Sequence, residues 1–348
     1  MKKLLPLCCL IGALVPFVYS QMPQMAVPGQ GVAGMSVDKV VELELLTESE
    51  VADKIAHGWV NAFLPAGGTE IRGQHAINGV HTILSHNRAV ESAKRLGNTI
   101  VAPTIPYAVA ATGGANANNW QKFMADGTIA PDAGAIQVTS ETFKGIVQGG
   151  VESLAYMGFK NIFLMGDHGG GQQEMKAVAD DMTEKLAARG VHVFWVSDFY
   201  QKTHEDIDMY MYNHRLPIAG PGAMMETAEM MYWEPTQFAY IRPNFKTIPY
   251  SGNSEDFDGW KARKDAAANG GGRGAGAAAG GARGAAGGGG RGAGNAAAGG
   301  GGGQRGPTVY PQGNPHPATK EIGKDLAEIG INNTVNEVKK QLSSIKGN

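Results

Sequence analysis

Short apolar segments that alternate with segments of helical periodicity constrain this chain more than any other feature. The apolar runs, which predict strands, cover residues 59–65, 99–103, 161–165 and 191–196. The segments with helical spacing, several of which end at a glycine, cover residues 43–55, 80–96, 140–156 and 172–189. This alternation predicts an α/β fold in which helices cover both faces of a mostly parallel central sheet.

The N-terminal residues lie outside this pattern. Lys2 and Lys3 precede an apolar run, and small residues follow it, so residues 1–20 predict a signal peptide that is cut near Ser20–Gln21. An uncleaved anchor or a core segment is the alternative. Cleavage would place the chain outside the cell or in a periplasm, without either of its two cysteines and without a stable membrane span. Residues 21–39, which are rich in Gln, Pro, Gly and Met, predict an extended arm.

A tract of glycine and alanine interrupts the folded pattern near the C-terminus. The 348 residues include 51 glycines, many of which lie between residues 266 and 306. Such a segment lacks the apolar surface that would offset the entropy of ordering, so we predict a disordered insertion over 263–308. Amphipathic spacing resumes over 318–342, which predicts a terminal helix. The folded domain would then comprise residues 40–262 and be completed by residues 309–348.

The charge balance argues against nucleic acid as a partner. The formal net charge is -2, so the chain has no broad positive field for a polyanion. Arginines in the glycine tract are sparse and lack interleaved aromatic residues, so they do not predict RNA binding. A tract of this kind could instead mediate contacts of a scaffold or surface-associated protein.

Two loops at predicted strand ends contain side chains that can bind a metal. The first follows the strand over 59–65 and contains Glu70, Arg72, His75 and His81, and the second contains Asp167 and His168 between glycines. Ligands bind parallel α/β sheets where strands end and helices begin. Imidazole and carboxylate are suitable ligands for zinc and similar ions. Each side chain could also have only a structural role, as an ion pair, a helix cap or a buried hydrogen bond.

Taken in order, these segments resemble the creatininase (creatinine amidohydrolase) family. The resemblance rests on the pattern Leu-Pro-x-Gly-x-x-Glu-x-x-Gly-x-His from Leu64, the strand that ends in His168-Gly-Gly, and segments 225–231 and 313–323. It extends from about residue 45 to the C-terminus and is interrupted only by the glycine tract. It implies a three-layer α/β/α fold, a divalent metal centre, a small-molecule amide substrate and, often, a homo-oligomer.

Comparison with the family's motif indicates an altered metal centre. Glu70 and His168 match family metal ligands. The histidine of the family's Glu-Gln-His is replaced by Arg72, which cannot bind a metal, and its bridging aspartate is replaced by His81, which offers one lone pair. We therefore expect one divalent ion, zinc or alternatively manganese, held by Glu70, His81 and His168.

The same comparison indicates which groups could move protons or stabilise charge. Pro221 stands where creatininase itself has a proton-transferring histidine, so another group would be needed. Asp167, His75 and Glu226 are the candidates, and Arg72 could supply positive charge to an oxyanion or an acidic substrate. The resemblance thus implies a metal-dependent hydrolase that cleaves a C–N bond of a small cyclic or linear amide. The alternative is a non-catalytic member that binds a small molecule or a protein through the same cleft.

Overall fold

The computed structural model describes residues 39–109, 125–127, 135–218, 220–251, 254–268 and 310–346. The predicted signal peptide and almost all of the predicted arm lie outside these residues, as does most of the predicted glycine-rich insertion. Within the described residues, no helix has both the length and the apolar character needed to cross a membrane.

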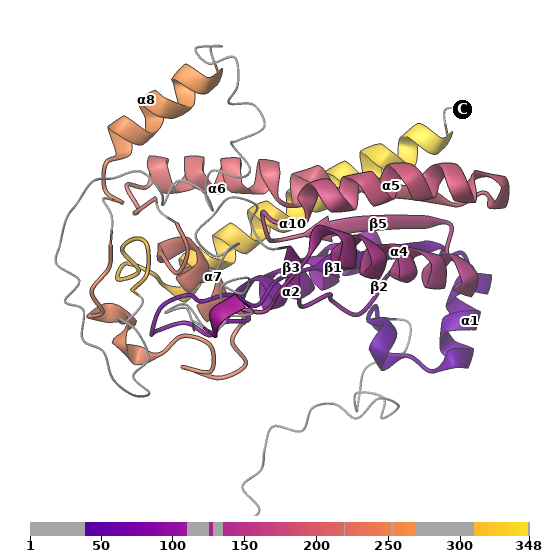
Figure 1. Ribbon diagram of the computed structural model, residues 1–348, viewed down its shortest axis with the longest axis horizontal. Coiled ribbons are helices and arrows are strands. Elements are labelled where there is room, and N and C mark those ends of the chain that lie inside the picture. Colours follow the sequence, from indigo (N-terminus) through magenta and orange to yellow (C-terminus); the bar gives the residue numbers. More distant parts are fainter. Residues whose placement is uncertain are drawn as a thin grey trace, which may run out of the picture.

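Four parallel strands form the central sheet (Figure 1). They are β1 (Asn61–Ala66), β2 (Thr99–Val101), β5 (Asn161–Gly166) and β6 (His192–Trp195), in the spatial order β2-β1-β5-β6. Every residue of β1 is buried, as are five of the six residues of β5. Both faces of the sheet are therefore covered, which explains why these strands are continuous apolar runs in the sequence. The short strands β3 (Ala108–Val109) and β4 (Gln137–Val138) form a separate parallel pair.

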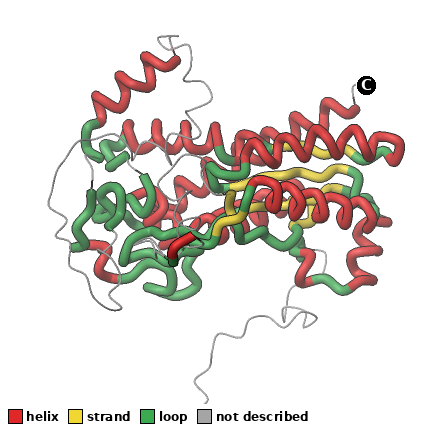
Figure 2. Tube along the Cα trace, in the orientation of Figure 1, coloured by secondary structure: helices red, strands yellow, loops and turns green. Residues whose placement is uncertain are grey.

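Helices pack on both faces of the sheet, and Figure 2 shows the strands lying among them. One face packs against α4 (Ser140–Met157) and α5 (Gln172–Leu186), with α1 (Glu48–Ala56) at the margin of the same apolar cluster. The other face packs against α2 (Val80–Leu96) and the long C-terminal helix α10 (Lys320–Lys346). The three-layer α/β/α fold predicted from the sequence is confirmed.

A further apolar cluster joins helices that lie beyond the sheet. It contains residues of α2, of α10, of α6 (Gln201–Asn213) and of α7 (Met224–Trp233). Met224, Met225 and Met230 of α7 are buried in it, so these methionines are core residues. Because α7 packs on α2 and α10, its polar side chains Glu226 and Glu229 lie near α2.

Most predicted helices end where the sequence indicates, and the differences have local causes. Gly97 and Gly158 adopt left-handed conformations at the ends of α2 and α4, as expected of C-terminal glycines. The single helix predicted over 43–55 is wrong, because Thr47 and Glu50 form a capping box that starts α1 at Glu48. A short 3-10 helix (Leu43–Leu45) precedes it.

The C-terminal half of the chain adds two further elements. A 3-10 helix covers Pro243–Lys246, and α8 (Phe257–Ala268) follows it. The last residues of α8 extend into the beginning of the predicted insertion, whose residues 269–308 lie outside the described part.

Candidate metal centre

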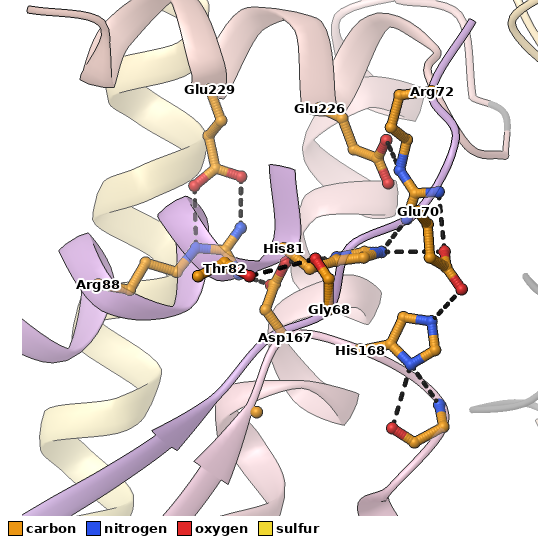
Figure 3. A network of polar contacts seen from close by, with 12 residues as sticks. Gly68, Glu70, Arg72, His81, Thr82, Arg88, Asp167, His168, Glu226 and Glu229 are labelled. Atoms are coloured by element: carbon orange, nitrogen blue, oxygen red, sulfur yellow. Dashed lines mark hydrogen bonds and ion pairs between the residues drawn. The ribbon is translucent and has the colours of Figure 1, made fainter. Parts of the chain in front are cut away.

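Three potential metal ligands converge at the carboxyl edge of the sheet (Figure 3). Glu70 lies in the loop after β1, His168 is the second residue after β5, and His81 is the second residue of α2. One ligand atom from each side chain can be chosen so that all three lie within 4.8 Å of one another. The donor set of two imidazoles and one carboxylate is chemically suited to a divalent ion such as zinc.

A glycine allows the loop after β1 to approach the start of α2 closely. A Cβ atom at Gly67 would overlap the backbone of Thr82, which hydrogen-bonds through its Oγ1 to the carbonyl oxygen of Gly68 (3.2 Å). Because β1 and β5 are adjacent and parallel, the loop that follows β5 starts beside the same edge.

His168 and Glu70 form a direct hydrogen bond. His168 Nδ1 faces the main chain of Gly170, at 2.9 Å from its nitrogen and 3.1 Å from its oxygen, so Nε2 is left to donate to Glu70 Oε1 (2.6 Å). Burial alone lowers the pKa of His168, but the bond to Glu70 outweighs burial and raises it. Burial raises the pKa of Glu70, yet His168 and Arg72 together bring it well below its usual range. Glu70 is therefore an ionised carboxylate.

Two neighbours define the tautomer of His81. Asp167 Oδ2 lies 2.9 Å from His81 Nδ1. Burial raises the pKa of Asp167, but Arg88 and His81 outweigh burial and lower it to about 2, so Asp167 accepts the Nδ1 proton. Burial first, and then Arg72, lower the pKa of His81, which is consequently neutral. Its Nε2 lone pair therefore faces Glu70, whose Oε2 is 3.8 Å away.

Arg72 occupies the space between these groups. Its guanidinium is 3% exposed and forms ion pairs with Glu70 Oε2 and Glu226 Oε2, each at 2.8 Å. Its Nη2 also donates to His81 Nε2, the lone pair that a metal would use. Burial opposes the charge, but Glu226 and Glu70 outweigh burial and raise the pKa of Arg72. The candidate centre thus contains a permanent cation of its own.

A second buried arginine, which the sequence did not single out, supports His81 from behind. Arg88 of α2 is 1% exposed, and its Nε donates to Glu229 Oε1 at 2.9 Å. Its Nη2 contacts Glu229 Oε2 and its Nη1 contacts Asp167 Oδ1. Glu229, Arg88, Asp167 and His81 therefore form one continuous polar chain. Partners of this kind orient a histidine and select its tautomer at metal sites.

The remaining predicted site residues are placed as follows. Glu226, in the first turn of α7, binds Arg72 and accepts a hydrogen bond from the main-chain nitrogen of Gly222 (2.8 Å). His75 is fully buried and hydrogen-bonds Thr227 Oγ1 at 3.0 Å, and burial lowers its pKa to about 4. The structure thus brings Glu70, Arg72, His81, Asp167, His168 and Glu226 into one network, with His75 beside α7.

The low pKa of Asp167 predicts acid sensitivity of the fold. Its folded-state pKa of about 2 lies below the ordinary value of 3.8, so its contribution to stability is complete above pH 4. That contribution, about 2 kcal/mol, is lost as the pH falls from 4 to 2. Denaturant unfolding across this range should show a smaller loss of stability for Asp167→Asn than for the wild type. The control is Asp181→Asn, at an exposed ion pair with Lys185, which should retain the wild-type pH dependence. The same change of unfolding free energy with pH in all three proteins would contradict the prediction.

Comparison with known proteins agrees with this architecture. The family model for creatinine amidohydrolase (creatininase) matches residues 44–338. A crystal structure of creatinine amidohydrolase is 18% identical, with a TM-score of 0.56 over 87% of this chain and 98% of that chain. A glutamate-to-glutamine mutant creatininase of the Zn-Zn type and a creatininase with Mn are also 18% identical. Each has a TM-score of 0.54 over 87% of this chain, and the matches cover 98% and 99% of the two chains, respectively.

No curated protein matches the chain. The family model nevertheless covers more than half of the sequence and the solved structures share its fold. The chain belongs to the creatininase family.

Proposed function

We propose that this protein is a divalent-metal-dependent hydrolase that cleaves a C–N bond of a small cyclic or linear amide. The observation that carries the proposal is the convergence of Glu70, His81 and His168, which would hold a single ion, zinc or alternatively manganese. Family membership supports a metal-dependent amidohydrolase, and the fold relatives include creatininases of the Zn-Zn type and with Mn.

Some residues of the centre would bind the ion, and others would position the residues that bind it. A divalent ion at this place supplies Lewis-acid chemistry, because it lowers the pKa of water and polarises a carbonyl. Asp167 keeps the His81 Nε2 lone pair directed at the centre, which is a positioning role consistent with its burial. Glu70 has 21% side-chain exposure, so it is the carboxylate of the centre that a substrate can reach most readily. We assign to it the binding of the ion, because a carboxylate whose pKa lies well below the usual range is suited to hold a cation rather than to take up a proton.

One observation favours a different function. The Arg72 guanidinium already neutralises Glu70 and Glu226 and contacts His81, so the cluster is satisfied without a metal. A non-catalytic member that binds a small molecule or a protein would need no more than this arrangement. The two functions differ in metal stoichiometry and in turnover.

Metal analysis and an amide panel test the proposal. The purified mature chain, incubated with zinc or manganese and then desalted, should contain one ion per chain by elemental analysis. It should release product from at least one member of a panel of cyclic and linear amides, creatinine included, and a chelator should abolish turnover until metal is restored. Zero ions per chain, or one ion without turnover of any amide, would favour the binding function instead.

We further propose that the protein is exported and forms a homo-oligomer. The proposal for export rests on residues 1–20, and that for assembly on family membership. N-terminal sequencing of the exported protein should begin near Gln21, and light scattering of the mature chain should give a mass above that of one chain. A protein that retains residues 1–20 in the cytoplasm would contradict export, and a monomeric mass would contradict assembly.

A further inference from the structure

The guanidinium of Arg72 occupies the position of a cation among the protein's own carboxylates. It lacks the exposure that an arginine needs to bind a substrate. Its side chain is 3% exposed, and all three nitrogens of its guanidinium have partners within the protein. Nε pairs with Glu226, Nη1 pairs with Glu70 and donates to the carbonyl oxygen of Ile71 (3.1 Å), and Nη2 contacts His81. The contact between Nε and Glu226 is an ion pair without hydrogen-bond geometry, so charge rather than a directed bond holds the arginine at that point.

The partners of Arg72 are also the groups that a divalent ion needs. Glu70 and His81 are two of the three converging ligands, and both contact the guanidinium. A guanidinium hydrogen bond to the His81 Nε2 lone pair and coordination of a metal by that lone pair exclude each other, because neutral imidazole has a single free lone pair.

The formal charge of the buried network limits how many ions it can hold. Its members are the carboxylates Glu70, Asp167, Glu226 and Glu229, the guanidiniums of Arg72 and Arg88, and the imidazoles of His81 and His168. With both imidazoles neutral, four negative and two positive charges leave two negative charges. One divalent ion balances these charges, whereas a second would place two uncompensated positive charges in a buried site.

We infer that the Arg72 guanidinium is a built-in cation of this centre, which takes the place of a second ion and competes with the first for Glu70 and His81. This inference rests on the proposed function and specifies how metal uptake at that site is controlled. Metal binding then requires Arg72 to release Glu70 and His81. Glu226 can retain the arginine meanwhile, because its contact is with Nε, the nitrogen nearest the flexible stem.

Zinc affinity of Arg72→Ala measures the competition directly. We expect the variant to bind zinc about 10- to 100-fold more tightly than the wild type, since a buried charge-assisted contact no longer opposes coordination. Guanidinium chloride, added below denaturing concentrations, should weaken zinc binding to Arg72→Ala by refilling the space, whereas sodium chloride at equal ionic strength should not. The matched control is Arg95→Ala, which removes an exposed ion pair with Glu328 and should leave zinc affinity unchanged.

The outcomes separate this inference from the proposed function. Tighter binding by Arg72→Ala supports the inference, and it does so even if the wild type takes up no zinc, in which case the proposed hydrolase is wrong for the native chain. Equal or weaker zinc binding by Arg72→Ala overturns the inference and leaves a metal-dependent hydrolase intact. No zinc in either protein overturns both.

Spectroscopy of the wild type covers the case in which Arg72→Ala does not fold. Zinc titrated into the wild-type chain labelled with ¹⁵N should shift the Arg72 Nη and His81 imidazole signals together, because the contact between Nη2 and the imidazole must break. An Arg72 signal that stays unchanged while His168 shifts on zinc binding would overturn the inference.

Discussion

His168→Ala is expected to remove the divalent ion from the candidate centre. His168 can offer Nε2 to an ion in the tautomer that has its proton on Nδ1, because Nδ1 then donates to the carbonyl oxygen of Gly170 (3.1 Å). Structural zinc sites bind with about 10–16 kcal/mol over four ligands. Loss of one ligand therefore costs roughly 3 kcal/mol, which raises the Kd more than 100-fold. Elemental analysis after desalting and calorimetric titration with zinc measure the loss.

The control for this prediction is a histidine that is exposed. His57 has 74% side-chain exposure and pairs with Asp53 one turn earlier in α1, so His57→Ala should keep the wild-type stoichiometry. His168→Ala should also unfold at a similar denaturant concentration to the metal-free wild type, because the lost bond to Glu70 is partly exposed. One tightly bound ion per chain in His168→Ala would contradict the prediction and place the metal elsewhere.

The meeting of the two loops could be predicted from the sequence because it depends on topology, and the resemblance to the creatininase family then indicated which of their side chains are the three ligands. Glu70 and His168 are 98 residues apart, yet each follows a buried strand, and the two strands are neighbours in a parallel sheet. His81 joins them because α2 starts directly after the first loop. Strand ends, chain order and the choice of ligand types are all readable without knowing how side chains pack.

The partners of these ligands could not be predicted, because they depend on how helices pack. Arg88 lies two turns beyond His81 on α2, and Glu229 lies one turn beyond Glu226 on α7. Their spacing places each pair on one face of its helix, which was an available signal. The contact between the two helices, however, is set by their crossing and by the methionine cluster, neither of which periodicity specifies. For the same reason the sequence suggested Arg72 as a group for the substrate, whereas the structure encloses it among Glu70, Glu226 and His81.

Arg88→Leu is expected to cost about 3–5 kcal/mol of unfolding free energy, the largest stability effect of any single change in this network. Arg88, Asp167 and Glu229 are each no more than 3% exposed. Removal of the guanidinium therefore leaves two carboxylates buried without their main cation. Burial already raises the pKa of Glu229 in the native chain, although Arg88 opposes it. Denaturant unfolding followed by circular dichroism measures the loss.

The pH dependence of this loss identifies its cause. Without Arg88, Glu229 can avoid its buried charge by taking up a proton, so its folded-state pKa should rise further above the unfolded value. A group with a raised folded-state pKa destabilises the fold increasingly as the pH rises, so Arg88→Leu should lose more stability at pH 8 than at pH 5. The double variant Arg88→Leu/Glu229→Leu should recover part of the loss, because the unpaired carboxylate is then absent. A loss that is independent of pH and is not reduced in the double variant would mean that Arg88 stabilises the fold through the packing of its side chain, and that its charge contributes little.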